Sequence, residues 1–130
     1  MRLYVDTNVF ADFLLERRNA FGKDIESPAF LLFARAMCCA FHLVVSDHAL
    51  RELSKVIRLS ETTAFFSSIK PKVIMVSATD DDERLARALP THFSDALHVV
   101  LARKAGADVI IMRNVGDFSS IYKARLPEDV

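Results

Sequence analysis

Short β-prone segments alternate with helical segments along this chain, and this alternation limits the possible folds more than any other feature. The β-prone segments lie at residues 2–5, 42–45, 72–76 and 109–112. Antiparallel strands can be joined by a hairpin, whereas parallel strands need a crossover of a dozen or more residues, usually a helix. All four segments are too far apart for hairpins. We therefore predict an α/β fold, a three-layer α/β/α sandwich with a central parallel sheet of four to five strands.

The segments between the strands have apolar residues at helical spacing and recognisable starts. Asp6-Thr7-Asn8, Ser46-Asp47, Thr79 and Ser94 can cap the helices that follow them. A helix restarting at Ser27-Pro28 is expected to bury one face, made of Phe30, Phe33, Ala34, Met37, Cys38 and Phe41. The helix after residue 46 should bury Leu50, Leu53, Val56 and Ile57, and a shorter helix should cover residues 61–68.

Length and composition limit the classes of protein that remain. A chain of 130 residues, 52% of them hydrophobic, has the size of one domain, so residues 1–130 are expected to form a single domain. Acidic and basic residues balance at 17 each, which excludes a global positive field for holding a polyanion. The two adjacent cysteines, Cys38 and Cys39, are interpreted as buried helix residues. The absence of a leader-like or membrane-spanning stretch predicts a cytoplasmic protein without membrane contact.

Four acids are expected to meet at one edge of the sheet. Asp6 follows the first strand, Glu52 lies in the helix after the second, Asp95 opens the helix before the fourth, and Asp117 lies in the loop after it. In an open parallel sheet all strands end along the same edge, where ligands bind. With the first strand central between the second and fourth, these carboxylates would converge on one pocket.

A pocket of converging carboxylates either raises some of their pKa values or recruits a cation. Oxygen ligands without histidine or cysteine select Mg²⁺ or Mn²⁺, which usually complete their shell with water and phosphate oxygens. One metal ion can activate a water, and a second, roughly 4 Å away, can stabilise the leaving oxygen. A phosphodiester substrate suits such a site.

Four motifs in order along the chain resemble the PIN domain family: Val5-Asp6-Thr7-Asn8-Val9, Leu50-Arg51-Glu52-Leu53, Ser94-Asp95-Ala96-Leu97-His98 and Arg113-Asn114-Val115-Gly116-Asp117-Phe118. The resemblance covers almost the whole chain. Small single-domain members of the family are largely VapC-type toxins of type II toxin–antitoxin modules. The resemblance implies a Mg²⁺- or Mn²⁺-dependent endoribonuclease that cleaves RNA, forms a homodimer and is held inactive by an antitoxin protein.

The resemblance also implies a role for each matched residue. Asp6, Glu52, Asp95 and Asp117 match the four acids of the family, as metal ligands and catalytic residues. Asn8 and Asn114 would fix the orientation of those carboxylates. The family commonly has threonine or serine where this chain has Met112, which cannot donate a hydrogen bond. This departure keeps open a noncatalytic PIN-like module that binds RNA or a protein partner.

Each acid also has an ordinary structural interpretation. Asp6 can be a helix cap, Asp95 a first-turn acid, Glu52 the partner of Lys55, and Asp117 a turn residue. His92 and His98 are left out of the site, because a histidine on an apolar helix is more often packed than functional. Arg51, Lys55, Arg58 and Arg113 either border the pocket and steer phosphates or are scattered surface charge. A phosphatase that forms an aspartyl intermediate is disfavoured because Asn8 occupies the second aspartate position of Asp-x-Asp.

Overall fold

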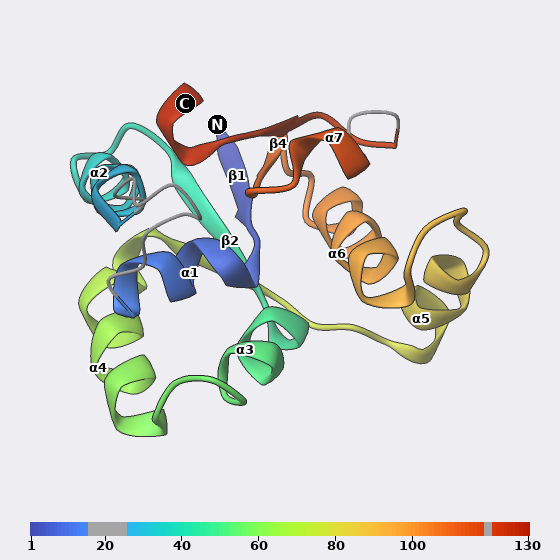
Figure 1. Ribbon diagram of the computed structural model, residues 1–130, viewed down its shortest axis with the longest axis horizontal. Helices are drawn as coiled ribbons and strands as arrows, with labels where there is room; N and C mark the ends of the chain where they lie inside the picture. Colours follow the sequence, from blue (N-terminus) through green and yellow to red (C-terminus); the bar gives the residue numbers. More distant parts are fainter. Residues whose placement is uncertain (16–25, 119–120) are drawn as a thin grey trace.

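A parallel sheet runs through the middle of the molecule in the order β3-β2-β1-β4-β5 (Figure 1). The computed structural model describes residues 1–15, 26–118 and 121–130, without the side chains of Glu26 and Asp117. Within these residues the strands are β1 (Arg2–Val5), β2 (His42–Ser46), β3 (Val73–Val76), β4 (Val109–Ile111) and β5 (Ala124–Arg125). The predicted central place of the first strand, between the second and the fourth, is confirmed by its parallel pairing with both.

Helices cover both faces of the sheet, as the α/β/α prediction requires. They are α1 (Thr7–Leu14), α2 (Glu26–Met37), α3 (Asp47–Leu53), α4 (Leu59–Ile69), α5 (Asp80–Arg87), α6 (Phe93–Lys104) and the short α7 (Val115–Phe118), with 3-10 turns η1 (Lys70–Lys72) and η2 (Pro127–Asp129). The helix expected at residues 61–68 therefore begins two residues earlier and ends one later. Of the four to five strands predicted, the fifth is present as the two-residue β5, which pairs with β4.

The alternation of side chains along β1 divides the core in two. Leu3 and Val5 pack on one face with residues of α1 and α2, whereas Tyr4 packs on the other with residues of α6. All three side chains are fully buried, because a central parallel strand has both faces covered. The polar hydroxyl of Tyr4 therefore lies inside the molecule and needs a hydrogen-bond partner there.

The predicted buried face of α2 is only partly right: Phe33 is buried as expected, as is Phe41 beyond the end of the helix, but the other predicted positions are not. The helix buries Ala29, Leu32, Phe33 and Ala36, while Phe30 and Met37 are exposed. Apolar residues surround this helix on most sides, so their spacing does not identify the inner face. The two cysteines are also not buried helix residues: both are exposed in the turn after α2, where Cys39 has a φ of 66°.

Val56 is exposed as well, contrary to the expectation that it lies on an inner helix face, because α3 ends at Leu53 and the chain then turns. Ser46 does cap α3 as predicted, its hydroxyl accepting a hydrogen bond from the amide of Ala49. Thr79 forms a reciprocal capping box with Asp82 at the start of α5. Among the described residues, none of the helices has the length and apolar character needed to cross a membrane.

Candidate active site

Asp6, Glu52 and Asp95 line one cavity of about 230 Å³ at the carboxyl edge of the sheet. Asp6 follows the last residue of β1, Glu52 lies on α3 and Asp95 lies in the first turn of α6. Because β1 is flanked by β2 and β4, the helices that follow or precede these strands bring the acids together. The remaining lining residues are Thr7, Asn8, Ala11, Val56, His98, Met112, Asn114 and Phe118.

The last of the four predicted acids is placed only by its backbone. Asp117 was expected in a loop, but it lies in the short helix α7. Its side chain is outside the described part of the structure. Asn8 and Asn114, predicted to orient carboxylates, both line the cavity. Met112 also lines the cavity and is buried. At the position where the family commonly has a hydroxyl, this chain therefore has a thioether side chain.

Glu52 is held by hydrogen bonds from two elements, α1 and α6. Its Oε1 accepts from the Thr7 hydroxyl at 3.0 Å and from Nε2 of His98 at 2.7 Å. Its Oε2 accepts from the Ser94 hydroxyl at 3.0 Å. The hydrogen bond from His98 is the main reason that the pKa of Glu52 is lowered to about 2. The bond pattern therefore keeps this carboxylate ionised and fixed in direction.

Behind His98 a chain of buried hydrogen bonds continues into the core. Nδ1 of His98 lies 2.6 Å from the Tyr4 hydroxyl, which lies 2.7 Å from Oγ of Ser46. A consistent assignment has Ser46 donating to Tyr4, Tyr4 donating to Nδ1, and Nε2 of His98 donating to Glu52. Each donor then meets an acceptor, and no buried side-chain polar atom among the described residues lacks a partner. Burial also raises the pKa of Tyr4, so its hydroxyl keeps its hydrogen.

A second histidine, His48, lies near the same carboxylate. Its Nε2 lies 3.0 Å from Oγ of Ser94 and 3.5 Å from Oε1 of Glu52. Because Ser94 donates to Glu52, it accepts from His48. Burial lowers the pKa of His48, and the nearby His98 acts in the same sense.

Neither histidine was included in the site predicted from the sequence. One signal was available for His48: it precedes Glu52 by four positions, which places the two side chains on the same face of a helix. His98 lies one turn after Asp95, but its contact with Glu52 depends on packing between two helices. Ser94 was predicted to be a cap, whereas α6 begins at Phe93 and the hydroxyl of Ser94 binds Glu52.

Asp6 is the most buried of the pocket acids, with 8% of its surface exposed. Burial raises the pKa of Asp6, and Glu52 adds to the rise, while His98, with Nε2 at 3.3 Å from Oδ1, opposes it. The described residues that line the cavity include no lysine or arginine. Carboxylates that meet in a cavity whose described lining has no lysine or arginine fit a divalent cation, since oxygen donors suit Mg²⁺ or Mn²⁺ and the ion offsets their repulsion.

Arg113 was considered as a group that steers phosphates, but its side chain binds two acidic residues of this chain. Its Nε donates to the buried Asp12 at 2.8 Å, and its Nη1 donates to Glu128 at 2.8 Å. These ion pairs join the segment after β4 to α1 and to the C-terminal turn. Arg113 therefore has a structural role in linking these segments.

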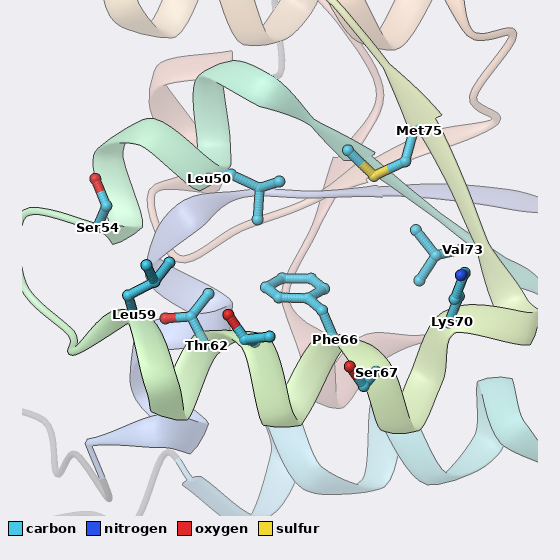
Figure 2. Close-up of a pocket in the computed structure, with 10 residues that line it drawn as sticks. Leu50, Ser54, Leu59, Thr62, Phe66, Ser67, Lys70, Val73 and Met75 are labelled. Atoms are coloured by element: carbon cyan, nitrogen blue, oxygen red, sulfur yellow. The ribbon is translucent and has the colours of Figure 1, made fainter.

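A larger cavity, of about 540 Å³, lies between α3, α4 and the edge strand β3 (Figure 2). Apolar side chains dominate its wall, among them Leu50, Leu59, Phe66, Val73 and Met75. Lys70 is the charged residue that lines it within the described chain. We name this surface the apolar groove. Without carboxylates it cannot hold a hard cation, so the acidic cavity remains the candidate active site.

A family model described as a PIN domain matches residues 2–116. The chain belongs to the PIN domain family. The predicted resemblance is thereby confirmed over nearly the whole chain. No curated protein sequence matches the chain.

Solved structures of other PIN proteins share this fold. VapC20 of Mycobacterium tuberculosis, a toxin that cleaves the sarcin–ricin loop, is 23% identical with a TM-score of 0.64, over 91% of this chain and 93% of that one. A chain of a toxin–antitoxin complex from Klebsiella pneumoniae is 18% identical with a TM-score of 0.67, over 96% of this chain and 97% of that one. A chain of VapBC-1 from nontypeable Haemophilus influenzae is 16% identical with a TM-score of 0.62, over 98% of each chain. The α/β/α fold with a central parallel sheet of four to five strands, predicted from the alternating segments, is that of these proteins, and this chain has five strands.

Proposed function

We propose that this PIN domain, residues 1–130, is a cytoplasmic, divalent-metal-dependent endoribonuclease that hydrolyses RNA phosphodiesters as the toxin of a toxin–antitoxin pair. The observation that carries the proposal is the single cavity lined by Asp6, Glu52 and Asp95 without a lysine or arginine among its described lining residues. Similarity to a toxin that cleaves an RNA loop supports RNA as the substrate class.

The residues of this chain divide the work of the proposed site. Asp6, Glu52, Asp95 and Asp117 would hold Mg²⁺ or Mn²⁺, and Asn8 and Asn114 would orient the carboxylates. The bound ion supplies activation of a water and stabilisation of charge on the phosphate. Thr7, Ser94 and His98 fix the Glu52 carboxylate in one direction, so little side-chain freedom is lost when the ion arrives.

The test is cleavage of structured RNA by the purified protein with Mg²⁺ or Mn²⁺. We expect cleavage that stops with chelator and is lost in Asp6→Asn and Asp95→Asn. Substitution of an exposed acid outside the cavity, Asp80→Asn, is the matched control and should leave the rate unchanged. Cleavage that survives both cavity substitutions would remove the proposal.

A homodimer and an antitoxin partner belong to the same proposal. Antitoxin association is supported by fold similarity to proteins solved as toxin–antitoxin complexes. Self-association is supported by the apolar groove beside β3, an edge strand whose Met75 is 54% exposed and which faces Leu59, 75% exposed, across the groove. An exposed apolar sheet edge favours pairing with another chain, and a net charge of zero gives little repulsion.

Two observations favour the second candidate, a noncatalytic PIN-like module that binds RNA or a protein partner. Met112 forms part of the cavity wall, and both oxygens of Glu52 are already engaged by protein hydrogen bonds. Calorimetric titration with Mn²⁺ separates the two candidates. The nuclease takes up the ion in the cavity and loses that uptake in Asp6→Asn, whereas the binding module shows RNA binding without turnover or dependence on the metal.

A further inference from the structure

Two histidines and a glutamate from the helices α3 and α6 gather beside the acidic cavity in a pattern that the proposed nuclease chemistry does not require. One ligand atom from each of His48, Glu52 and His98 lies within 4.8 Å of the other two. The imidazole centroids of the two histidines are 4.6 Å apart. Both Nε2 atoms lie near the same oxygen, Oε1 of Glu52, at 3.5 Å for His48, which also contacts Oγ of Ser94, and at 2.7 Å for His98.

These distances are near those of a coordinated transition metal. A tetrahedral Zn²⁺ with bonds of about 2.0–2.1 Å holds its ligand atoms roughly 3.3 Å apart. The two nitrogen–oxygen distances lie on either side of that value. The three ligand atoms lie within 4.8 Å of one another, so side-chain rotations must draw them together around an ion. Glu52, whose side chain is 32% exposed, gives access from solvent for the ion and a water ligand.

The groups behind His98 suit a metal ligand. To bind a metal, an imidazole needs a lone pair on Nε2 and a hydrogen on Nδ1, usually donated to an oxygen. The Tyr4 hydroxyl at Nδ1 can accept that hydrogen and turn its own toward Ser46, since a hydroxyl is both donor and acceptor. Shifting the ring hydrogen from Nε2 to Nδ1 thus leaves Tyr4 paired in both states.

We propose that His48, Glu52 and His98 form a site for a borderline-soft transition metal ion, Zn²⁺ being the best match, that is distinct from the all-oxygen site proposed above. Two imidazoles and one carboxylate, with water as a fourth ligand, are a donor set that Zn²⁺ binds and that Mg²⁺ does not favour. The two sites share Glu52. Zinc bound to the histidines withdraws this carboxylate from the oxygen site, so zinc inhibits the nuclease, a consequence that rests on the proposed function.

The binding test uses the full chain with the exposed thiols removed, because Cys38 and Cys39 could otherwise take zinc themselves. In this Cys38→Ser/Cys39→Ser background, zinc affinity is measured by calorimetry and Co²⁺ is used as a visible-absorbing probe. His48→Gln is expected to weaken zinc binding at least about tenfold. His42→Gln, at an exposed histidine at the opposite end of β2 from His48, is the matched control and should bind like its parent.

A second measurement needs no histidine substitution and decides the matter if His48→Gln does not fold. Zinc is titrated into the Cys38→Ser/Cys39→Ser protein while the ring nitrogens of its four histidines are followed by NMR. The Nε2 signals of His48 and His98 are expected to shift together at one equivalent, with those of His42 and His92 unmoved. Shifts confined to His42 or His92, or equal zinc affinity in folded His48→Gln and its parent, would overturn the proposal.

Inhibition is read last, as the rate of RNA cleavage with Mn²⁺ at increasing zinc, each protein compared with its own rate without zinc. The parent should lose activity at zinc concentrations at least about tenfold lower than His48→Gln does. Equal zinc sensitivity in the two proteins would count against the shared use of Glu52. If no cleavage is found at all, the proposed function fails, while calorimetry and NMR still decide the zinc site.

Discussion

Nε2 of His98 on α6 donates to Oε1 of Glu52 on α3 across 2.7 Å, although the residues are 46 positions apart in the chain. The same nitrogen lies 3.3 Å from Oδ1 of Asp6. One imidazole therefore contacts two carboxylates that enter the cavity from different elements. This contact is the main cause of the lowered pKa of Glu52, whereas burial raises the pKa of Asp6 and His98 only opposes that rise.

Asp6→Asn should abolish activity and yet stabilise the metal-free protein. The folded-state pKa of Asp6 is raised, so folding favours its protonated form: that stability is present below the unfolded-state pKa and is lost as pH rises through the folded-state value. At neutral pH the buried charge costs free energy, which a neutral amide removes. We expect a gain of about 1 kcal/mol in the free energy of unfolding and a loss of cleavage of at least about 100-fold.

Urea unfolding at pH 7 with chelator, beside Asp80→Asn, measures the stability effect. Adding Mn²⁺ should then stabilise the wild type and leave Asp6→Asn unchanged. An Asp6→Asn protein that is less stable than the wild type without metal would contradict this explanation.

The general architecture and the meeting of the acids follow from local patterns, whereas the hydrogen bonds of the site do not. Alternating segments predict parallel strands, and parallel strands end at one edge, which places Asp6, Glu52 and Asp95 there. The direction of the Glu52 carboxylate depends instead on His98 and Ser94, residues of another helix. The register between two packed helices is set by the whole core, so the sequence around Glu52 carries no sign of it.

The incorrect prediction for part of the buried face of α2 also has a physical reason. Apolar residues occupy nearly every position of α2. The face that the helix buries contains two alanines, Leu32 and Phe33, and α2 packs against α1. Phe30 and Met37 then remain exposed. Hydrophobic spacing identifies an inner face only where the outer face is polar.

Glu52→Gln should reduce stability at neutral pH and lose that effect in acid. The folded-state pKa of Glu52 is depressed to about 2 from an ordinary 4.5, so its stabilising contribution is present above pH 4.5 and is lost as pH falls toward 2. We expect Glu52→Gln to cost about 2 kcal/mol at pH 7, as for a hydrogen bond to a charged group. The difference from wild type in urea unfolding should shrink steadily below pH 4.5, while the exposed control Glu61→Gln stays near wild type throughout. A constant difference across this range would contradict the assigned role of the carboxylate.

Tyr4→Phe should destabilise the core without removing any apolar volume. The substitution deletes the hydroxyl between Nδ1 of His98 and Oγ of Ser46 and leaves both buried atoms without that partner. The expected cost is about 1–3 kcal/mol in the free energy of unfolding. NMR of the His98 ring should also show a changed balance of hydrogen between Nδ1 and Nε2. A Tyr4→Phe protein with wild-type stability and an unchanged His98 spectrum would show that the hydrogen bond from Tyr4 does not hold this imidazole.

Charge introduced on the apolar groove should disrupt self-association. Met75 lies on the exposed edge strand β3 and Leu59 on the facing end of α4, and both line the groove. Burial of a lysine in an apolar interface is costly, so Met75→Lys and Leu59→Lys are each expected to weaken a dimer at least about tenfold, as measured by light scattering over a concentration series. Leu85→Lys, an equally exposed leucine on the distant α5, controls for the added charge. If Leu85→Lys dissociates the dimer and the two groove variants do not, the contact between copies lies on α5 instead of the groove.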